Sequence, residues 1–317
     1  MQNKINEPDS VKTDSTNPSQ DVVESVKPSF STVLFNKRNL WLFPVSFIIF
    51  VSLWEWIVVY FDIDDFIFPA PSDVAEALLR GLVFIETGPQ SGTADFSSVM
   101  QHSFYLHISH TLFEAVLGFI IGSIIGLGLG LVFMQSKWIE AIIMPYVVAF
   151  QTLPKLAIAP LFIIWFGYEV ESKVFLAGLV AFFPLLVNTM VGLRSADQDQ
   201  LDLLRSLSAS RWTTFRKLQF PNALPFIFAG LEIAVVFSLL GAILGEFVGA
   251  GMCMWGGRGQ CGLGVLLMQM SFSADTTGTF AVLILLSFMG LGMHKIVQVT
   301  KKKILFWAPE TEQTMGS

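Results

Sequence analysis

The residues best suited to chemistry are ionisable side chains that interrupt long apolar stretches. The acids are Glu55, Glu114, Glu232 and Glu246, and the base is Lys155. A charge in hydrocarbon is costly, so such side chains face protein, water or an ion pathway. A proton-driven carrier would use these acids as relays. Apart from Glu232, however, each acid is expected within one or two turns of a helix end, where water could reach it, and both interpretations stay open.

Three histidines, His102, His107 and His110, form an H-x4-H-x2-H pattern in a chain with only four histidines. Membrane di-iron enzymes need several such boxes, so we expect no metal site here, only solvated histidines near a span entrance. No Gly-x4-Gly-Lys-Ser/Thr phosphate loop is present, and no Gly-Lys pair. The chain is therefore not expected to bind ATP itself or to do covalent chemistry.

The composition indicates that lipid is the natural solvent. The chain is 53% hydrophobic and only 14% charged, against about 25% charged in soluble domains. A net charge of −6 argues against nucleic-acid partners. Six apolar runs are each about 20 residues or longer, enough to cross about 30 Å of hydrocarbon as a helix. They lie at about 40–60, 111–134, 141–166, 174–193, 223–248 and 279–299.

We therefore expect an all-α, polytopic membrane protein with six transmembrane helices. Residues 37–308 would form the membrane domain, with tails at 1–36 and 309–317. The tail at 1–36 is polar and has no apolar period, so we expect it to be disordered. Lys and Arg gather in the segments on one side of the predicted membrane, which makes that side cytoplasmic, together with both termini. The basic residues on the other side are Arg80, Lys173 and Arg258.

Two outer segments are long. In the segment 61–110, Ser72 is expected to cap a short helix whose apolar face carries Val74, Ala77, Leu78 and Leu82. The segment 249–278 is rich in glycine and holds both cysteines, Cys253 and Cys261. Disulfides persist outside the cytoplasm, and a bridge between these two cysteines and a pair of free thiols both remain open.

The third apolar run contains Pro145, Pro154 and Pro160, which predict a kinked or broken helix. Broken helices at membrane depth line a cavity or pack against protein. Lys155, close to Gln151, could line a translocation path or cap a carbonyl at the break. The candidate path residues are Gln151, Pro154, Lys155, Asn188 and Glu246.

The second apolar run carries Gly118, Gly122, Gly126 and Gly130, one glycine every fourth residue. This spacing places four glycines on nearly one helix face, so a second helix can approach the backbone closely. We favour packing within the chain over a seam between two subunits.

The cytoplasmic segment 194–221 is the most informative part of the sequence. Asp197 or Asp199 is expected to cap a short helix carrying Leu201, Leu204 and Leu207, which the break at 208–210 would end. Ser210 is expected to cap a second helix carrying Trp212, Phe215 and Leu218. The segment could rest on lipid headgroups, or it could lay Leu203, Leu204 and Leu207 into a groove on a cytoplasmic partner.

This segment resembles the coupling loop of permease subunits of bacterial ABC importers. The family pattern of Glu-Ala-Ala, a glycine and a later Ile-x-Leu-Pro is matched by Asp202-Leu203-Leu204, Ser208 and Leu218-Gln219-Phe220-Pro221. The stretches QTLPKLAIAPLFIIWFG (151–167), ALPFIFAGLEIA (223–234) and WEW…FIFPAPSDV (54–74) resemble the nitrate, sulfonate and taurine branch. The resemblance covers about residues 40–310.

The resemblance implies a bacterial inner-membrane permease in which two copies of the chain, or two related subunits, form the path. Separate ATPase subunits would bind ATP and Mg and contact the loop at 197–217, and an external binding protein would deliver the solute. The implied solute is nitrate, a sulfonate, taurine, bicarbonate or a vitamin precursor. Serine replaces the family glycine at 208, and the outer loops at 84–108 and 252–261 look enlarged. The alternative is a secondary transporter driven by an ion gradient. The residues expected to contact the ATPase are Asp202, Leu203, Leu204, Arg205, Leu207, Ser208, Ala209, Ser210 and Arg211.

Overall fold

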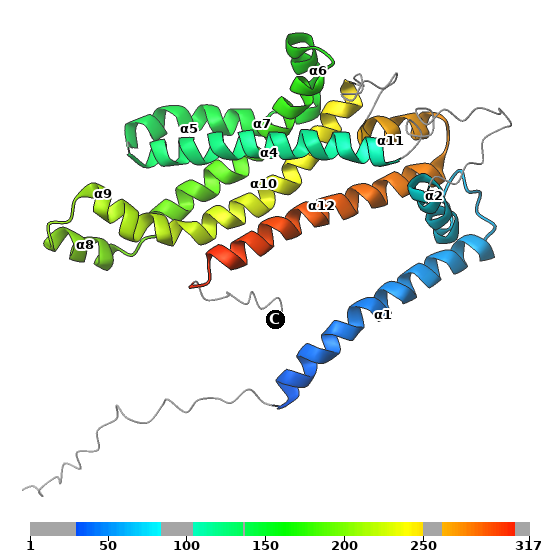
Figure 1. Ribbon diagram of the computed structural model, residues 1–317, viewed down its shortest axis with the longest axis horizontal. Coiled ribbons are helices and arrows are strands. Elements are labelled where there is room, and N and C mark those ends of the chain that lie inside the picture. Colours follow the sequence, from blue (N-terminus) through cyan, green and yellow to red (C-terminus); the bar gives the residue numbers. More distant parts are fainter. Residues whose placement is uncertain (1–29, 84–103, 136, 250–261, 308–317) are drawn as a thin grey trace, which may run out of the picture. The chain divides into compact units, whose positions relative to one another are not determined.

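The structure is a computed structural model that describes residues 30–83, 104–135, 137–249 and 262–307 (Figure 1). Every regular element within these ranges is helical. The elements are α1 (Phe30–Tyr60), α2 (Pro71–Val83), α4 (Phe104–Gln135), α5 (Lys137–Thr152), α6 (Lys155–Phe166), α7 (Val170–Arg194), α8 (Gln198–Ser206), α9 (Arg211–Thr214), the π-helical turn η1 (Phe215–Gln219), α10 (Phe220–Val248), α11 (Leu263–Phe272) and α12 (Thr276–Ile304).

The chain divides into two compact parts, residues 1–56 and 57–317, and each is described by itself. Most of α1 belongs to the first part, and it contains the predicted first span at 40–60. Its apolar side chains, such as Phe47 and Phe50, are exposed, as expected of a helix whose solvent is lipid. The helix begins at Phe30, so residues 30–36, which were predicted to belong to the disordered tail, are helical.

Four helices of the second part are long and apolar enough to span a membrane: Phe104–Met134, Val170–Arg194, Arg211–Val248 and Thr276–Ile304. They contain the predicted runs at 111–134, 174–193, 223–248 and 279–299. The run predicted at 141–166 is two helices, α5 and α6, bent by 104° at a short break. These two helices form a fifth span if the bent pair crosses the membrane once.

The outer helix α2 differs from its prediction at its start. It begins at Pro71, and the N–H groups of Asp73 and Val74 both donate to the carbonyl of Ala70. Ser72 therefore lies inside the first turn and is not the cap. The predicted apolar face is confirmed, since Val74 is buried and Ala77, Leu78 and Leu82 are half-buried.

Helix α7 is the centre of the second part, with α4 and α10 packed against it (Figure 1). The four spaced glycines of α4 all face α7. A side chain at Gly122 would collide with the backbone of Gly178, and one at Gly118 would collide with Ala177. The predicted packing within the chain is therefore confirmed.

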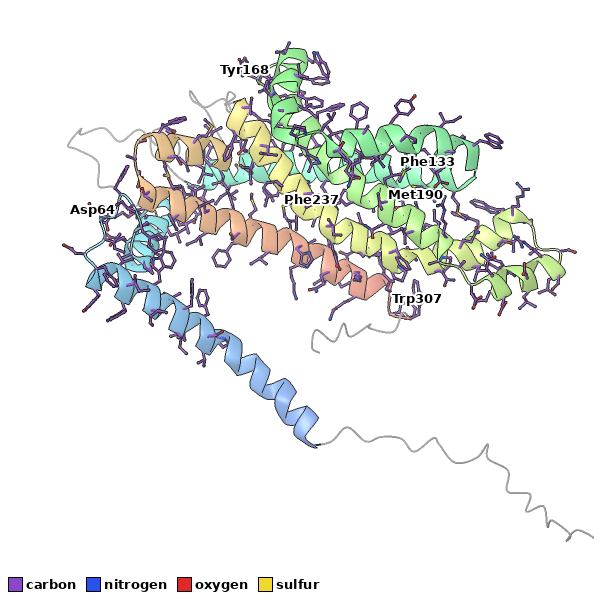
Figure 2. All side chains as sticks on the ribbon, turned by 180° about the vertical axis from the view of Figure 1, so that it is seen from behind. Asp64, Phe133, Tyr168, Met190, Phe237 and Trp307 are labelled. Atoms are coloured by element: carbon purple, nitrogen blue, oxygen red, sulfur yellow. The ribbon has the colours of Figure 1, made fainter. Side chains whose placement is uncertain are left out.

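Small residues also set the contact between α7 and α10. A methyl group at Gly241 would lie 2.7 Å from the Cα atom of Ala177, closer than packed atoms allow. Larger side chains pack where α7 meets α4 and α5, in a cluster that contains Phe133 of α4 and Met190 of α7 (Figure 2). The helix backbones are thus in near contact along the middle of α7.

This packing predicts that Gly122→Leu destabilises the protein, whereas Gly128→Leu does not. A side chain at Gly128 meets nothing within 4 Å, and both substitutions gain the same helix propensity. Overpacking at Gly122 should cost about 1–3 kcal/mol or more. Thermal unfolding of the purified protein in detergent measures the difference, and equal midpoints for the two variants would contradict the close contact of α4 with α7.

Candidate functional site

The segment between α7 and α10 forms a short, capped helix followed by a tight turn. The side chain of Asp197 accepts a hydrogen bond from the Asp199 N–H at 2.9 Å, so Asp197 is the cap of α8. Within α8, Arg205 donates to the carboxylate of Asp202 at 2.7 Å. At the end of α8 the Ala209 N–H donates to the Leu204 carbonyl at 3.0 Å. The loop is therefore held by its own hydrogen bonds.

The turn lies at the predicted break. Ser208 adopts φ of 56°, a left-handed conformation that glycine accepts freely and serine does not. Ser210 then caps α9, accepting a hydrogen bond from the Thr213 N–H at 3.2 Å, as predicted. The expectation of a separate second surface helix is wrong, because α9 continues through η1 into α10 as one helix from Arg211 to Val248.

Two leucines of this loop project outward. Leu203 is 60% exposed and Leu207 is 68% exposed, whereas Leu204 is half-buried. Trp212 is also exposed, and its ring stacks on that of Phe215, with centroids 5.6 Å apart. Leu207 directly follows α8, and its N–H donates to the Leu203 carbonyl at 3.1 Å. The two leucines are four residues apart and so lie on one side of this last turn. We call this pair the exposed loop leucines.

The break between α5 and α6 is built around Pro154. The proline precedes the first residue of α6 in an extended conformation, with φ of −67° and ψ of 108°. The Lys155 ammonium donates to the Gln151 carbonyl at 2.5 Å. Lys155 therefore caps a carbonyl at the break, which was one of the two predicted roles, and the Gln151 side chain is exposed.

The other two candidate path residues make contacts inside the helix bundle. The Asn188 amide donates to the Pro184 carbonyl one turn earlier, at 2.8 Å. Glu246 is fully buried. One of its carboxylate oxygens accepts from the Thr111 hydroxyl and the other from the Gly264 N–H, both at 2.6 Å. The structure thus brings Gln151, Pro154 and Lys155 together and places Asn188 and Glu246 elsewhere.

Glu246 belongs to a buried charge cluster that the sequence did not predict. We define this cluster as Glu114 of α4, Lys173 of α7 and Glu246 of α10, all at most 2% exposed. The Lys173 ammonium lies 3.7 Å from Oε1 of Glu114 and donates to the Tyr168 carbonyl at 3.3 Å. Each of the three central helices therefore contributes one ionisable side chain. Lys173 was expected in an outer loop, but it lies in the first turn of α7.

The histidines next to the cluster are buried, contrary to the expectation that they are solvated. His107 and His110 are at most 5% exposed. Nδ1 of His107 lies 2.9 Å from the Gly262 carbonyl and 3.1 Å from its N–H. A signal was present in the sequence, because His107, Thr111 and Glu114 recur at spacings of four and three along one face of a helix.

Several other predictions concern residues outside the described ranges. Cys253 and Cys261, His102 and most of the two enlarged outer loops are among them. Residues 104–108, assigned to the first of those loops, form the start of α4.

Comparison with known proteins identifies the family. Residues 118–304 match the family model described as binding-protein-dependent transport system inner membrane component. The riboflavin transport system permease protein RibX of Chloroflexus aurantiacus is 30% identical over 83% of this chain and 89% of its own length. The formylaminopyrimidine transport permease protein ThiX of Halalkalibacterium halodurans is 33% identical over 64% of this chain and 78% of its own.

The fold has a counterpart among solved structures. A chain of the MetNI methionine ABC transporter, in an inward-facing conformation, superposes with a TM-score of 0.50 over 63% of this chain and 97% of that one, at 17% identity. This likeness concerns the fold alone. The family is identified by the sequence matches, which cover most of the helical bundle. The chain belongs to the family of binding-protein-dependent transport system inner membrane components, the permease subunits of ABC importers.

Proposed function

We propose that this permease couples ATP hydrolysis in separate ATPase subunits to solute import through the loop between α7 and α10. The observation that carries the proposal is the pair of exposed loop leucines. They project from a short helix that is capped at Asp197 and closed by the Ser208 turn. Burying two leucine side chains in a partner's groove would contribute roughly 1.5–3 kcal/mol each.

The loop is connected to the rest of the bundle by continuous helices. It follows α7 directly and leads through α9 and η1 into α10. At its base, Arg194 of α7 forms an ion pair with Glu140 of α5, the helix that ends at the break. A displacement of the loop would therefore reach α7, α10 and α5. ATP-driven closure of the ATPases would act by favouring one of two bundle arrangements through its contacts with the loop.

The translocation path would form between this chain and a second permease copy. We assign Gln151, Pro154 and Lys155 to it, because the break leaves them at an exposed corner of the chain. Asn188 and Glu246 keep their proposed path role only if the bundle opens, since both are engaged in helix contacts in this arrangement. ATP and Mg would be held by the partner ATPases and not by this chain.

The solute would come from an external binding protein. Nitrate, a sulfonate, taurine, bicarbonate and a vitamin precursor are the classes considered from the sequence. The names of two relatives refer to riboflavin and to formylaminopyrimidine, which are nitrogen heterocycles. Other relatives are named as aliphatic sulfonate permeases. We therefore propose a vitamin precursor or a sulfonate as the solute. The protein would lie in the bacterial inner membrane with both termini in the cytoplasm.

The first prediction concerns the exposed loop leucines. Leu203→Arg and Leu207→Arg should each abolish retention of the ATPase or solute-stimulated hydrolysis, because the groove would have to desolvate an unpaired charge. Leu204→Arg should also disturb α8, since Leu204 is half-buried. Pull-down of the ATPase and hydrolysis by the reconstituted complex are the measurements.

Gln198→Arg is the matched control for the loop variants. It adds the same charge to the same helix, on roughly the opposite side from the leucines at 100° per residue. It should assemble and hydrolyse ATP normally. Normal transport by Leu203→Arg and Leu207→Arg would remove the loop from the coupling role and favour the alternative of an ion-gradient carrier.

A second prediction concerns the turn. Ser208→Gly should stabilise the loop by about 1 kcal/mol, because glycine adopts the left-handed conformation without the cost that serine bears. Hydrogen exchange of the amides at 203–210 should slow by up to about fivefold. Ser206→Gly, inside α8, should speed it instead. Faster exchange in Ser208→Gly would mean that the turn is not left-handed in solution.

A third prediction concerns topology. In a background without Cys253 and Cys261, Arg205→Cys should be protected from an impermeant thiol reagent in intact cells, whereas Gln90→Cys should be labelled. Permeabilised cells provide the control, because both positions should then react. Labelling of both positions in intact cells would contradict the proposed orientation.

A further inference from the structure

The buried charge cluster holds more negative than positive groups. Glu114 and Glu246 carry carboxyl groups, and Lys173 is the one basic side chain among the described residues that is paired with them. All three side chains are buried. Burying charges without a counter-charge costs several kcal/mol per ion. If all three groups were ionised, the cluster would carry one uncompensated negative charge. A cation is therefore expected inside it.

The hydrogen bonds indicate which carboxyl group carries the excess. Both oxygens of Glu246 accept hydrogen bonds, from Thr111 and from the Gly264 N–H, as an ionised carboxylate would. Oε1 of Glu114 faces Lys173. Oε2 of Glu114 is buried without a hydrogen-bond donor. The carboxyl groups of Glu114 and Glu246 lie within hydrogen-bonding reach of each other, so a hydrogen on Glu114 would have an acceptor.

We propose that Glu114 and Glu246 form a proton-binding site, in which one proton is carried on Oε2 of Glu114 and donated to the carboxylate of Glu246. The proton is taken from water and returned to it. With this proton the cluster is neutral, since Glu246 and Lys173 balance and Glu114 is uncharged. Within the described residues no group of three or more His, Cys, Asp and Glu side chains is arranged to hold a metal ion.

Four elements surround the site, and three of them contribute ionisable side chains. Helix α7 contributes Lys173, and α10 contributes Glu246. Helix α4 contributes His107 and His110, and His110 lies beside Lys173. The segment 262–264, which leads into α11, contributes backbone groups only. A side chain at Gly262 or Gly264 would collide with the Glu246 carboxylate, so glycine is what lets this segment close over the site.

The proton should stabilise the folded bundle most strongly at low pH. Above about pH 5 a glutamate in the unfolded chain is ionised, whereas the folded protein still holds its proton at Glu114. The folded state then binds one proton more than the unfolded state, so stability falls as pH rises. With a difference of one bound proton, each unit increase in pH raises the unfolding equilibrium constant by up to tenfold. Loss of the proton would place two carboxylates against each other where α4, α10 and the 262–264 segment meet.

Glu114→Gln tests the site, because a glutamine amide is neutral and can donate to Glu246 as the protonated acid would. Thermal unfolding midpoints of the full-length protein in detergent would be measured from pH 5 to pH 9. The midpoint of the wild-type protein should fall more steeply with pH than that of Glu114→Gln. The two histidines are present in both proteins, so their titration cancels in the difference. Glu232→Gln is the control, since Glu232 pairs with Lys301 in a partly exposed position and should leave the wild-type pH dependence unchanged.

Infrared spectroscopy gives a second, independent measurement. Wild-type protein at neutral pH should show the C=O stretch of a protonated, buried carboxylic acid, and Glu114→Gln should lack it. The pH curves of wild type and Glu114→Gln would coincide, or would run parallel with Glu114→Gln less stable by the same amount at every pH, if Glu114 were ionised and paired with Lys173. Either result, or the absence of the acid band from the wild type, overturns the proposal.

Discussion

The close approach of α4 and α10 to α7 is the constraint on which the rest of the bundle depends. In lipid there is no hydrophobic force between helices, so association relies on packing of surfaces that fit and on polar contacts. Gly122 against Gly178, and Gly241 against Ala177, bring the backbones together. The other glycines of α4 repeat this contact along the helix. As a result, α7 is held between α4 and α10.

The same close approach allows three charges to be buried together. A methyl group at Gly245 would lie only 3.0 Å from the Cα and Cγ atoms of Lys173, so the stem of the lysine packs on a bare backbone. The 262–264 segment covers Glu246 in the same way. Water cannot solvate the three groups, which must therefore satisfy one another.

The sequence predicted features that depend on local chemistry and missed those that depend on tertiary contacts. Apolar length predicted the spanning helices, and the glycine spacing predicted the face of α4 that packs. The caps at Asp197 and Ser210 follow from side-chain hydrogen bonds within four residues. By contrast, Lys173 and His107 are buried by partners far away in the chain, and Gly262 lies 155 residues from His107. A local sequence pattern cannot reveal a contact between residues so far apart in the chain. The spacing of the polar residues on α4 nevertheless indicates which face of that helix is buried.

The loop and the charge cluster lie at opposite ends of α7, which joins them as one continuous helix of 25 residues. Such a helix is about 37 Å long at 1.5 Å per residue. Pro184 lies inside it, but the segment around the proline is packed by α4 on one side and by α10 on the other. Bending of α7 at Pro184 would break these close contacts. A displacement of the loop is therefore expected to move α7 as a rigid unit and not to bend it in its middle. Because Lys173 is part of that unit, its distance to Glu114 on α4 has to change whenever α7 shifts along α4.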